Sequence, residues 1–118
     1  MRLLLPLLLA ACGPEVSYRD EVFPLLQDHC TRCHGVRDPD AGLDLYSTGP
    51  AGMIDVASRQ SPLPLVTAGD HLNSYLFHKI NGTQTLAQGS GTQMPIGSTL
   101  TDAEIELIAQ WIDDGAPW

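Results

Sequence analysis

The sequence predicts a small single domain of the all-α class with long irregular loops. Three segments carry the apolar spacing and the end signals of helices, and they lie near the beginning, in the second half and at the end of the chain. A long stretch over 36–52 is rich in Gly, Pro and Asp, which is typical of loop. The 118 residues are enough for one modest core, and a domain of this size gains from any large apolar group that it can enclose.

The first predicted helix covers Ser17 to Gln27. Its apolar face, at i, i+3, i+4 and i+7 spacing, consists of Val22, Leu25, Leu26 and His29. Pro24 lacks an amide donor and would kink a helix that begins at Ser17. Either the helix begins later, near Asp20, or its first turn is irregular, and we expect the later start. Gly35 is expected to end this helical segment and to let the chain turn away.

The middle of the chain is expected to be mostly irregular. Residues 43–46 alternate apolar and polar side chains, which favours a short extended piece. Pro50 is well placed to open a short helix through Ile54 and Val56. The prolines within residues 62–66 predict an extended apolar segment there.

Two later helices carry clear end signals. Asp70 can cap a helix that Gly82 ends. The apolar face of this helix consists of Leu72, Tyr75, Leu76 and Ile80. At the end of the chain, Thr101 and Glu104 form a capping-box pattern and Gly115 fits the position that stops a helix.

The last predicted helix should pack its apolar stripe against the first helix. The hydrophobic staple at its start is formed by Leu100 and Ile105. The stripe consists of Ile105, Ile108, Ala109 and Ile112, with Trp111 at its border.

The strongest chemical signal is the Cys-Thr-Arg-Cys-His run over 30–34. Thiols three residues apart fall on neighbouring points of a helix face, so Cys30 and Cys33 can bond the two vinyl groups along one edge of a haem. His34 can then ligate the iron as a proximal histidine. The run therefore predicts one covalently attached haem c.

Two other interpretations of this run remain open. A redox dithiol usually follows a strand in a βαβ pattern, whereas the residues before Cys30 have the pattern of an amphipathic helix. A structural zinc site needs two further ligands at similar spacing, and the chain has no second cysteine pair. His29, His71 and His78 could complete a zinc set, although their scatter differs from the paired spacing of such sites.

Met94 is the candidate for the second axial ligand of the iron. A thioether suits haem iron, and a methionine in an irregular loop that Pro95 stiffens can be aimed at the metal. Met53 falls in the short predicted helix, which favours a place in the core. His71 and His78 are alternative distal ligands, although such histidines are more often surface or hydrogen-bonding residues.

The N-terminal residues 1–11 are expected to be a signal peptide. Arg2 gives a minimal positive region, and an apolar run over 3–9, too short to span a bilayer, precedes small residues. The Leu-Ala-Ala-Cys sequence over 9–12 resembles the lipobox of bacterial lipoproteins, which implies cleavage before Cys12 and acyl chains on it. Residues 12–16 would then be a lipidated tether that holds the domain of residues 17–118 on a membrane. The alternative is an ordinary signal with a stray cysteine.

The cysteine count and the net charge narrow the function further. With Cys12 on lipid and the other two cysteines on haem, none of the three is left for a disulfide. The formal net charge of −8 makes nucleic acid an unlikely partner and favours a basic docking partner or simple solubility. Arg59 is a candidate counter-charge for the haem propionates, or else a solvated surface arginine.

The sequence resembles a class I cytochrome c domain in the Cys-Thr-Arg-Cys-His-Gly run over 30–35, in Met94-Pro95, and in a final helix with Trp111-Ile112 and Gly115-Ala116. It resembles the single-domain cytochrome c lipoproteins of myxobacteria and their relatives in Ala68-Gly69-Asp70, Ser74-Tyr75-Leu76 and His78-Lys79. The resemblance spans about residues 16–118. It departs from the commonest forms in the long Gly/Pro-rich segment over 36–64, which leaves the propionate contacts and the docking edge open.

The resemblance implies an all-α haem fold with crossing first and last helices, His34 and Met94 as axial ligands, and one-electron transfer. We expect an exported, membrane-anchored lipoprotein that faces the periplasm or the cell exterior and meets redox partner proteins through a weak, transient interface. The alternative function is a haem-based sensor or ligand-binding module with a labile sixth iron position. Near Met94 the sequence has no grouping of His, Arg or carboxylate residues that suggests acid/base catalysis, so we do not expect an enzyme. A hollow is expected between Cys33 and Met94.

Overall fold

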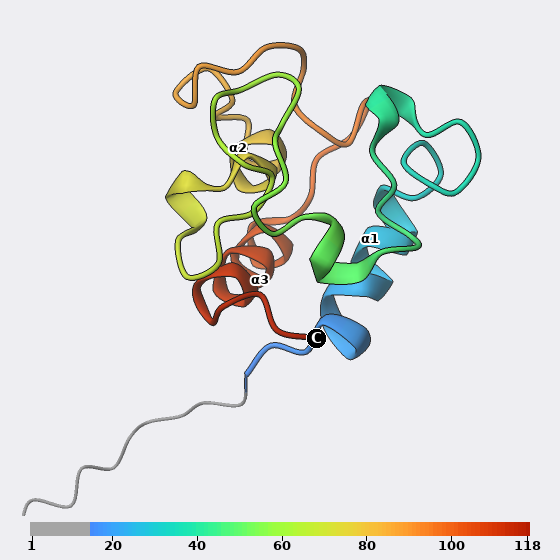
Figure 1. The fold of residues 1–118 in the computed structure, drawn as a ribbon, viewed down its shortest axis with the longest axis vertical. Coiled ribbons are helices and arrows are strands. Elements are labelled where there is room, and N and C mark those ends of the chain that lie inside the picture. The colour runs from blue at the N-terminus through green and yellow to red at the C-terminus, as the bar shows by residue number, and fades with distance from the viewer. Residues whose placement is uncertain (1–14) are drawn as a thin grey trace, which may run out of the picture.

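The computed structural model describes residues 15–118, which fold into three α-helices joined by short helical turns and irregular segments (Figure 1). The α-helices are α1 (Phe23–His29), α2 (Tyr75–Asn81) and α3 (Asp102–Asp113). The short turns are the π-helical η1 (Tyr18–Val22) and the 3₁₀ turns η2 (Asp40–Gly42), η3 (Gly49–Gly52) and η4 (His71–Asn73). Residues 15–118 contain two isolated β-bridges and no strand, so the all-α class is confirmed. The predicted signal peptide and Cys12 lie outside the described residues.

The first helical segment begins with an irregular turn, so the expected start near Asp20 is wrong. The Ser17 hydroxyl accepts the Asp20 amide at 3.2 Å, and the Val22 amide donates to the Ser17 carbonyl across five residues. Pro24 is the second residue of α1 and has no amide to donate. In a regular α-helix, an amide at position 24 would donate to the carbonyl four residues earlier. The wider π turn upstream of Pro24 accommodates this carbonyl. Of the predicted apolar face, Val22, Leu25 and Leu26 are buried as expected, whereas His29 is exposed.

The N-terminal helical segment packs along α3 in the opposite direction. The Tyr18 and Trp111 rings lie 5.4 Å apart near the end of α3. Near the start of α3, His29 Nε2 lies 3.2 Å from Glu104 Oε2. Contacts at both ends mean that the two segments run antiparallel, so the last helix lies against the first as predicted. Of the predicted stripe, however, Ile105 and Ala109 face α2 and line a cavity with Phe77. Trp111 is wholly buried rather than at the border of the stripe.

The ends of α3 are those that the sequence predicts. The Thr101 hydroxyl accepts the Glu104 amide at 3.2 Å, and the Glu104 carboxylate accepts the Thr101 amide at 2.9 Å. This is the reciprocal pairing of a capping box. After the helix, Gly115 has a φ of +101°, and the amides of Gly115 and Ala116 donate to carbonyls of the last turn at 2.9 Å each. This pair of bonds is a Schellman motif.

The second predicted helix is split at its start. Asp70 caps η4 by accepting the Asn73 amide at 3.3 Å, but Ser74 is extended and α2 begins only at Tyr75. Leu72 consequently leaves the predicted apolar face and is 61% exposed. Gly82 ends α2 with a φ of +73°, as predicted.

The middle of the chain supports the start of α2. The amides of Tyr75 and Leu76, which lack partners inside the helix, donate to the carbonyls of residues 64 and 65 at 2.9 and 3.0 Å. Within the predicted extended segment over 62–66, Pro64 and Val66 form isolated β-bridges with Ala57 and Ile54, so the prediction is confirmed at these two positions. The Asp55 amide donates to the Val66 carbonyl at 2.9 Å. The predicted helix from Pro50 through Val56 is wrong, because η3 ends at Gly52 and Asp55 has a φ of +57°, which interrupts a right-handed helix.

Candidate functional site

The run over 30–34 forms a single turn directly after α1. At Cys30 the backbone leaves the helical region with a φ of −126°, so the expectation that both thiols sit on a helix face is wrong. The turn is nevertheless closed, because the Cys30 carbonyl accepts the amides of Cys33 at 3.2 Å and His34 at 2.9 Å. Cys30, Cys33 and His34 are thus held on one compact turn.

The two thiols of this turn are both free. Cys30 is partly buried and Cys33 is exposed, and neither forms a disulfide. Burial, followed by the nearby Cys33, raises the pKa of the Cys30 thiol to about 11. Redox dithiols work through a thiolate whose pKa is lowered. The environment of Cys30 therefore disfavours a thiolate at this position, which a redox dithiol would use. Neither sulfur is engaged in a disulfide.

The imidazole of His34 is oriented by the loop that follows it. His34 Nδ1 lies 2.9 Å from the carbonyl oxygen of Asp40. Because a carbonyl only accepts, Nδ1 carries the proton and Nε2 keeps its lone pair in the neutral ring. Histidines that bind metals commonly hold their other nitrogen in this way. The arrangement leaves the lone pair of Nε2 available to a metal.

The orienting loop is itself fastened at both ends. The Asp40 amide donates to the Cys33 carbonyl at 2.8 Å, and the Leu45 amide donates to the His34 carbonyl at 2.9 Å. Leu45 is buried in the core, which anchors the far end. The role of Asp40 could not be predicted from the sequence, because the atom concerned is a backbone carbonyl and no side-chain pattern marks it.

Position 35 requires glycine because the chain passes close to the backbone of Thr31, and not because a helix ends there. A Cβ atom at this position would lie 2.6 Å from the Thr31 carbonyl oxygen. Since α1 already ends at His29, the expectation that Gly35 ends the helix is wrong. Its role is to let the chain after His34 pass against the preceding turn.

Met94 lies in the segment between α2 and α3. Its amide donates to the carbonyl of Lys79 in α2 at 2.9 Å, its side chain is partly buried, and the Met94–Pro95 peptide bond is cis. In Figure 1 this segment crosses from the α2 side toward the side where α1 and its following loop lie before it enters α3. Ile96, two residues after Met94, is 75% exposed, and Val36, two residues after His34, is 64% exposed.

The structure does not itself pair Met94 with His34. Within residues 15–118, no hydrogen bond joins the 30–34 turn to the 92–97 segment. Two cavities, of about 410 and 240 Å³, lie elsewhere, and neither is lined by Cys33 or Met94. The expected hollow is therefore not one of these two cavities. The shared iron stays a prediction.

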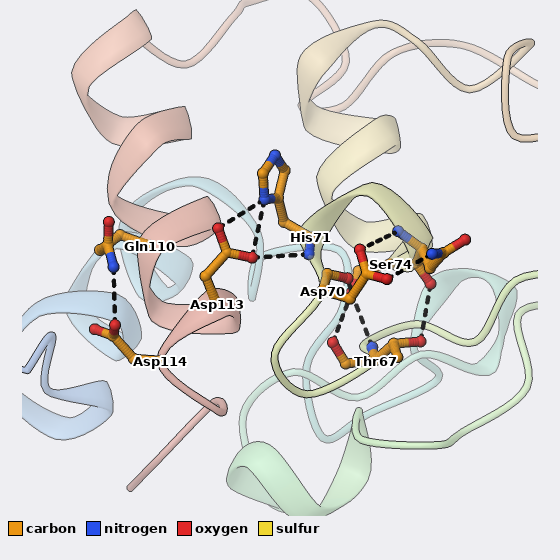
Figure 2. Close-up of polar contacts among 8 residues, drawn as sticks. Thr67, Asp70, His71, Ser74, Gln110, Asp113 and Asp114 are labelled. Atoms are coloured by element: carbon orange, nitrogen blue, oxygen red, sulfur yellow. Dashed lines mark hydrogen bonds and ion pairs between the residues drawn. The ribbon is translucent and has the colours of Figure 1, made fainter.

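The competing ligand candidates are engaged in other contacts. His78 is buried, with Nε2 2.7 Å from the Leu72 carbonyl and Nδ1 2.8 Å from the Thr83 hydroxyl. His71 Nδ1 lies 2.8 Å from the Asp113 carboxylate (Figure 2). Both histidines thus have the hydrogen-bonding roles that the sequence favoured. Met53 is 1% exposed, which confirms its place in the core.

The remaining site residue is Arg59, whose guanidinium lies against Gly42 in the loop after His34. Its contact with a propionate stays a prediction. Within residues 15–118, no group of three or more His, Cys, Asp or Glu side chains is placed to hold a metal ion, so zinc finds no support there.

The donor set fits a haem c. It offers two free thiols, an imidazole with a free Nε2 and, in a separate loop, one thioether. No family model, curated protein or solved structure matches the chain. In the described part of the chain, none of the helices has the length and apolar character needed to cross a bilayer.

Proposed function

We propose that this protein is a membrane-tethered mono-haem c-type cytochrome that carries single electrons, with a class I cytochrome c fold. Cys30 and Cys33 would bind the porphyrin edge, His34 Nε2 and the Met94 sulfur would be the axial ligands, and Cys12 would carry the lipid. A bound haem c supplies an iron that changes between ferrous and ferric states by one electron.

One observation carries the proposal: the 2.9 Å contact between His34 Nδ1 and the Asp40 carbonyl. A surface histidine with no ligating role gains little from a fixed ring. Here the ring is fixed within the turn that also presents two free thiols, and the nitrogen left available is the one that points away from the backbone contact. A histidine that binds a metal requires an imidazole ring held in a fixed orientation in this way.

The chain's own residues would tune the site by shielding it. Val36 and Ile96 each lie two residues after a proposed ligand, and their apolar side chains are exposed. A bound porphyrin would offer an apolar surface that both side chains could cover. With both axial positions filled by protein, the iron exchanges electrons and not ligands. We therefore propose an electron carrier and not an enzyme. The protein would be exported to the periplasm or cell exterior, would meet redox partner proteins through a weak interface, and would not bind nucleic acid.

The Met94→Ala substitution tests the proposal on the membrane-extracted protein. We expect the visible spectra of the oxidised and reduced protein to show a low-spin c-type haem, and Met94→Ala to change them because the sixth ligand is lost. Met53→Leu is the matched control, since Met53 is buried in the core and should leave both spectra as they are. Unchanged spectra in Met94→Ala would remove Met94 as a ligand and favour the haem-based sensor with a labile sixth position. A protein without haem would refute both functions.

A further inference from the structure

A groove of about 410 Å³ lies between α2 and α3. Its apolar floor is formed by Phe77, Ile105 and Ala109. Its rim is acidic and consists of Asp102, Glu106 and Asp113. The groove shares no lining residue with the 30–34 turn or with Met94, so its use goes beyond the proposed function.

The rim carries negative charge that the described part of the chain does not neutralise. Asp102 and Glu106 are one helical turn apart on α3, and neither has a hydrogen-bond or ion-pair partner among residues 15–118. All of α3 contains four acidic residues and no Lys or Arg. Two like charges at i, i+4 spacing repel each other, so a cation that approaches them is attracted by both.

The basic groups nearest the groove are already engaged. His71 is the only basic side chain that lines it, and Asp113, which also lines the groove, holds this ring (Figure 2). Lys79, on α2, donates from Nζ to Gln60 Oε1 at 2.7 Å and to the Ser90 carbonyl at 2.9 Å. These bonds tie Lys79 to the segments before and after α2 and leave Asp102 and Glu106 without a cation among residues 15–118.

The floor of the groove can take an apolar side chain. Phe77 is only partly buried and its ring packs edge-on against the His71 ring, with centroids 4.7 Å apart. Ile105 is also partly buried. A concave apolar floor inside a polar rim is the arrangement of a recognition site, and the volume is in the range of pockets that hold a large side chain or a small ligand.

We infer that this groove docks a basic amphipathic segment of a partner protein. An apolar side chain of the segment would enter the floor, and its Lys or Arg side chains would face Asp102 and Glu106. A second copy of this chain is a poor occupant, because it carries the same net charge of −8. Nucleic acid is excluded by the same charge.

An amphipathic Lys/Leu peptide tests this inference on the holoprotein, followed by amide chemical shifts in NMR titration. We expect shifts centred on Phe77, Ile105 and Ala109, and binding that weakens as salt is raised. The double variant Asp102→Asn/Glu106→Gln should weaken binding by about fivefold. The control Asp20→Asn/Asp55→Asn removes the same charge away from the groove, and Asn tolerates the positive φ of residue 55. This control should bind as the wild type does.

Ala109→Phe provides a second variant that keeps every charge. It should fill the floor and abolish the shifts, and it keeps the inference testable if the charge variant folds poorly. Equal weakening in the control, equal binding of spermine, or equal binding of a Glu/Leu peptide would each overturn the inference. None of these variants should alter the haem spectrum, so failure of the docking site and failure of the proposed function are distinguishable.

Discussion

Tyr18 buries its hydroxyl without a hydrogen-bond partner among residues 15–118. Its ring is 3% exposed and packs against the rings of Phe23, Trp111 and Trp118. Burial raises the pKa of this phenol, so the hydroxyl stays neutral. An unsatisfied buried hydroxyl costs about 1–3 kcal/mol, while the ring itself contributes favourable packing.

Replacing the hydroxyl alone should therefore stabilise the protein. We expect Tyr18→Phe to raise the free energy of unfolding by about 1 kcal/mol, measured by chemical denaturation. Tyr46→Phe is the control, because Tyr46 is 49% exposed and its hydroxyl is solvated. A loss of stability in Tyr18→Phe would mean that the hydroxyl finds a partner in solution.

At this scale the sequence predicts the site in part. Cys30, Cys33 and His34 are neighbours in the chain, so their spacing alone identifies them. The carbonyl of Asp40 leaves no side-chain signal, although it orients His34. The proposed pairing of His34 with Met94 would join distant segments, and a local pattern contains no information on how the chain between them returns.

Among the elements, α3 was predicted to within one residue because its signals are local. The capping box and the Schellman motif are each contained within a few consecutive residues. The start of the first helical segment was placed too late although its cause, Pro24, is local, whereas the start of α2 was missed because it depends on distant contacts. The missing amide of Pro24 is accommodated by a π turn, and α2 begins where the carbonyls of residues 64 and 65 can receive its first amides.

Glu104 links the capping box of α3 to α1. The Thr101 amide, and with a smaller effect the His29 ring, hold the pKa of the Glu104 carboxyl below its ordinary value. Because the folded pKa lies below the unfolded one, the carboxylate stabilises the fold above its unfolded pKa of about 4.3. This contribution is lost as the pH falls through the lower folded pKa.

The Glu104→Gln variant isolates this charge, since Gln can still accept the Thr101 amide. We expect the wild type to be more stable than Glu104→Gln by about 0.5 kcal/mol at neutral pH, because the pair is partly solvated. The difference should disappear by about pH 3 in urea denaturation curves. Glu106→Gln, on the same helix, is the control. A difference that persists in acid would assign the effect to packing.

Across the whole molecule, α3 is the element on which the others converge. Its two ends receive the only ion pairs within residues 15–118, one from His29 to Glu104 and one from His71 to Asp113. The Gly69 amide also donates to the Ile112 carbonyl at 2.7 Å. The core around α3 draws on all three helices and on Met53 and Val66 from the segment between η3 and η4.

The molecule carries far more negative than positive charge. The chain has fourteen acidic residues against six Lys and Arg, and within the described part neither Lys nor Arg forms an ion pair. Partly exposed His–carboxylate pairs contribute little each. Repulsion among the acidic groups therefore outweighs attraction, and screening should favour the folded state.

Raising sodium chloride to about 0.5 M, where the Debye length is about 4 Å, should increase the melting temperature by several degrees. Circular dichroism at several salt concentrations measures this. Asp20→Asn/Asp55→Asn should melt higher than the wild type at low salt and respond less to added salt, because two repelling charges are gone. Salt screens attraction and repulsion alike, so the sign of the change in melting temperature reports which of them dominates. A melting temperature that falls with salt would mean that attraction in the two histidine pairs on α3 outweighs repulsion from the net charge.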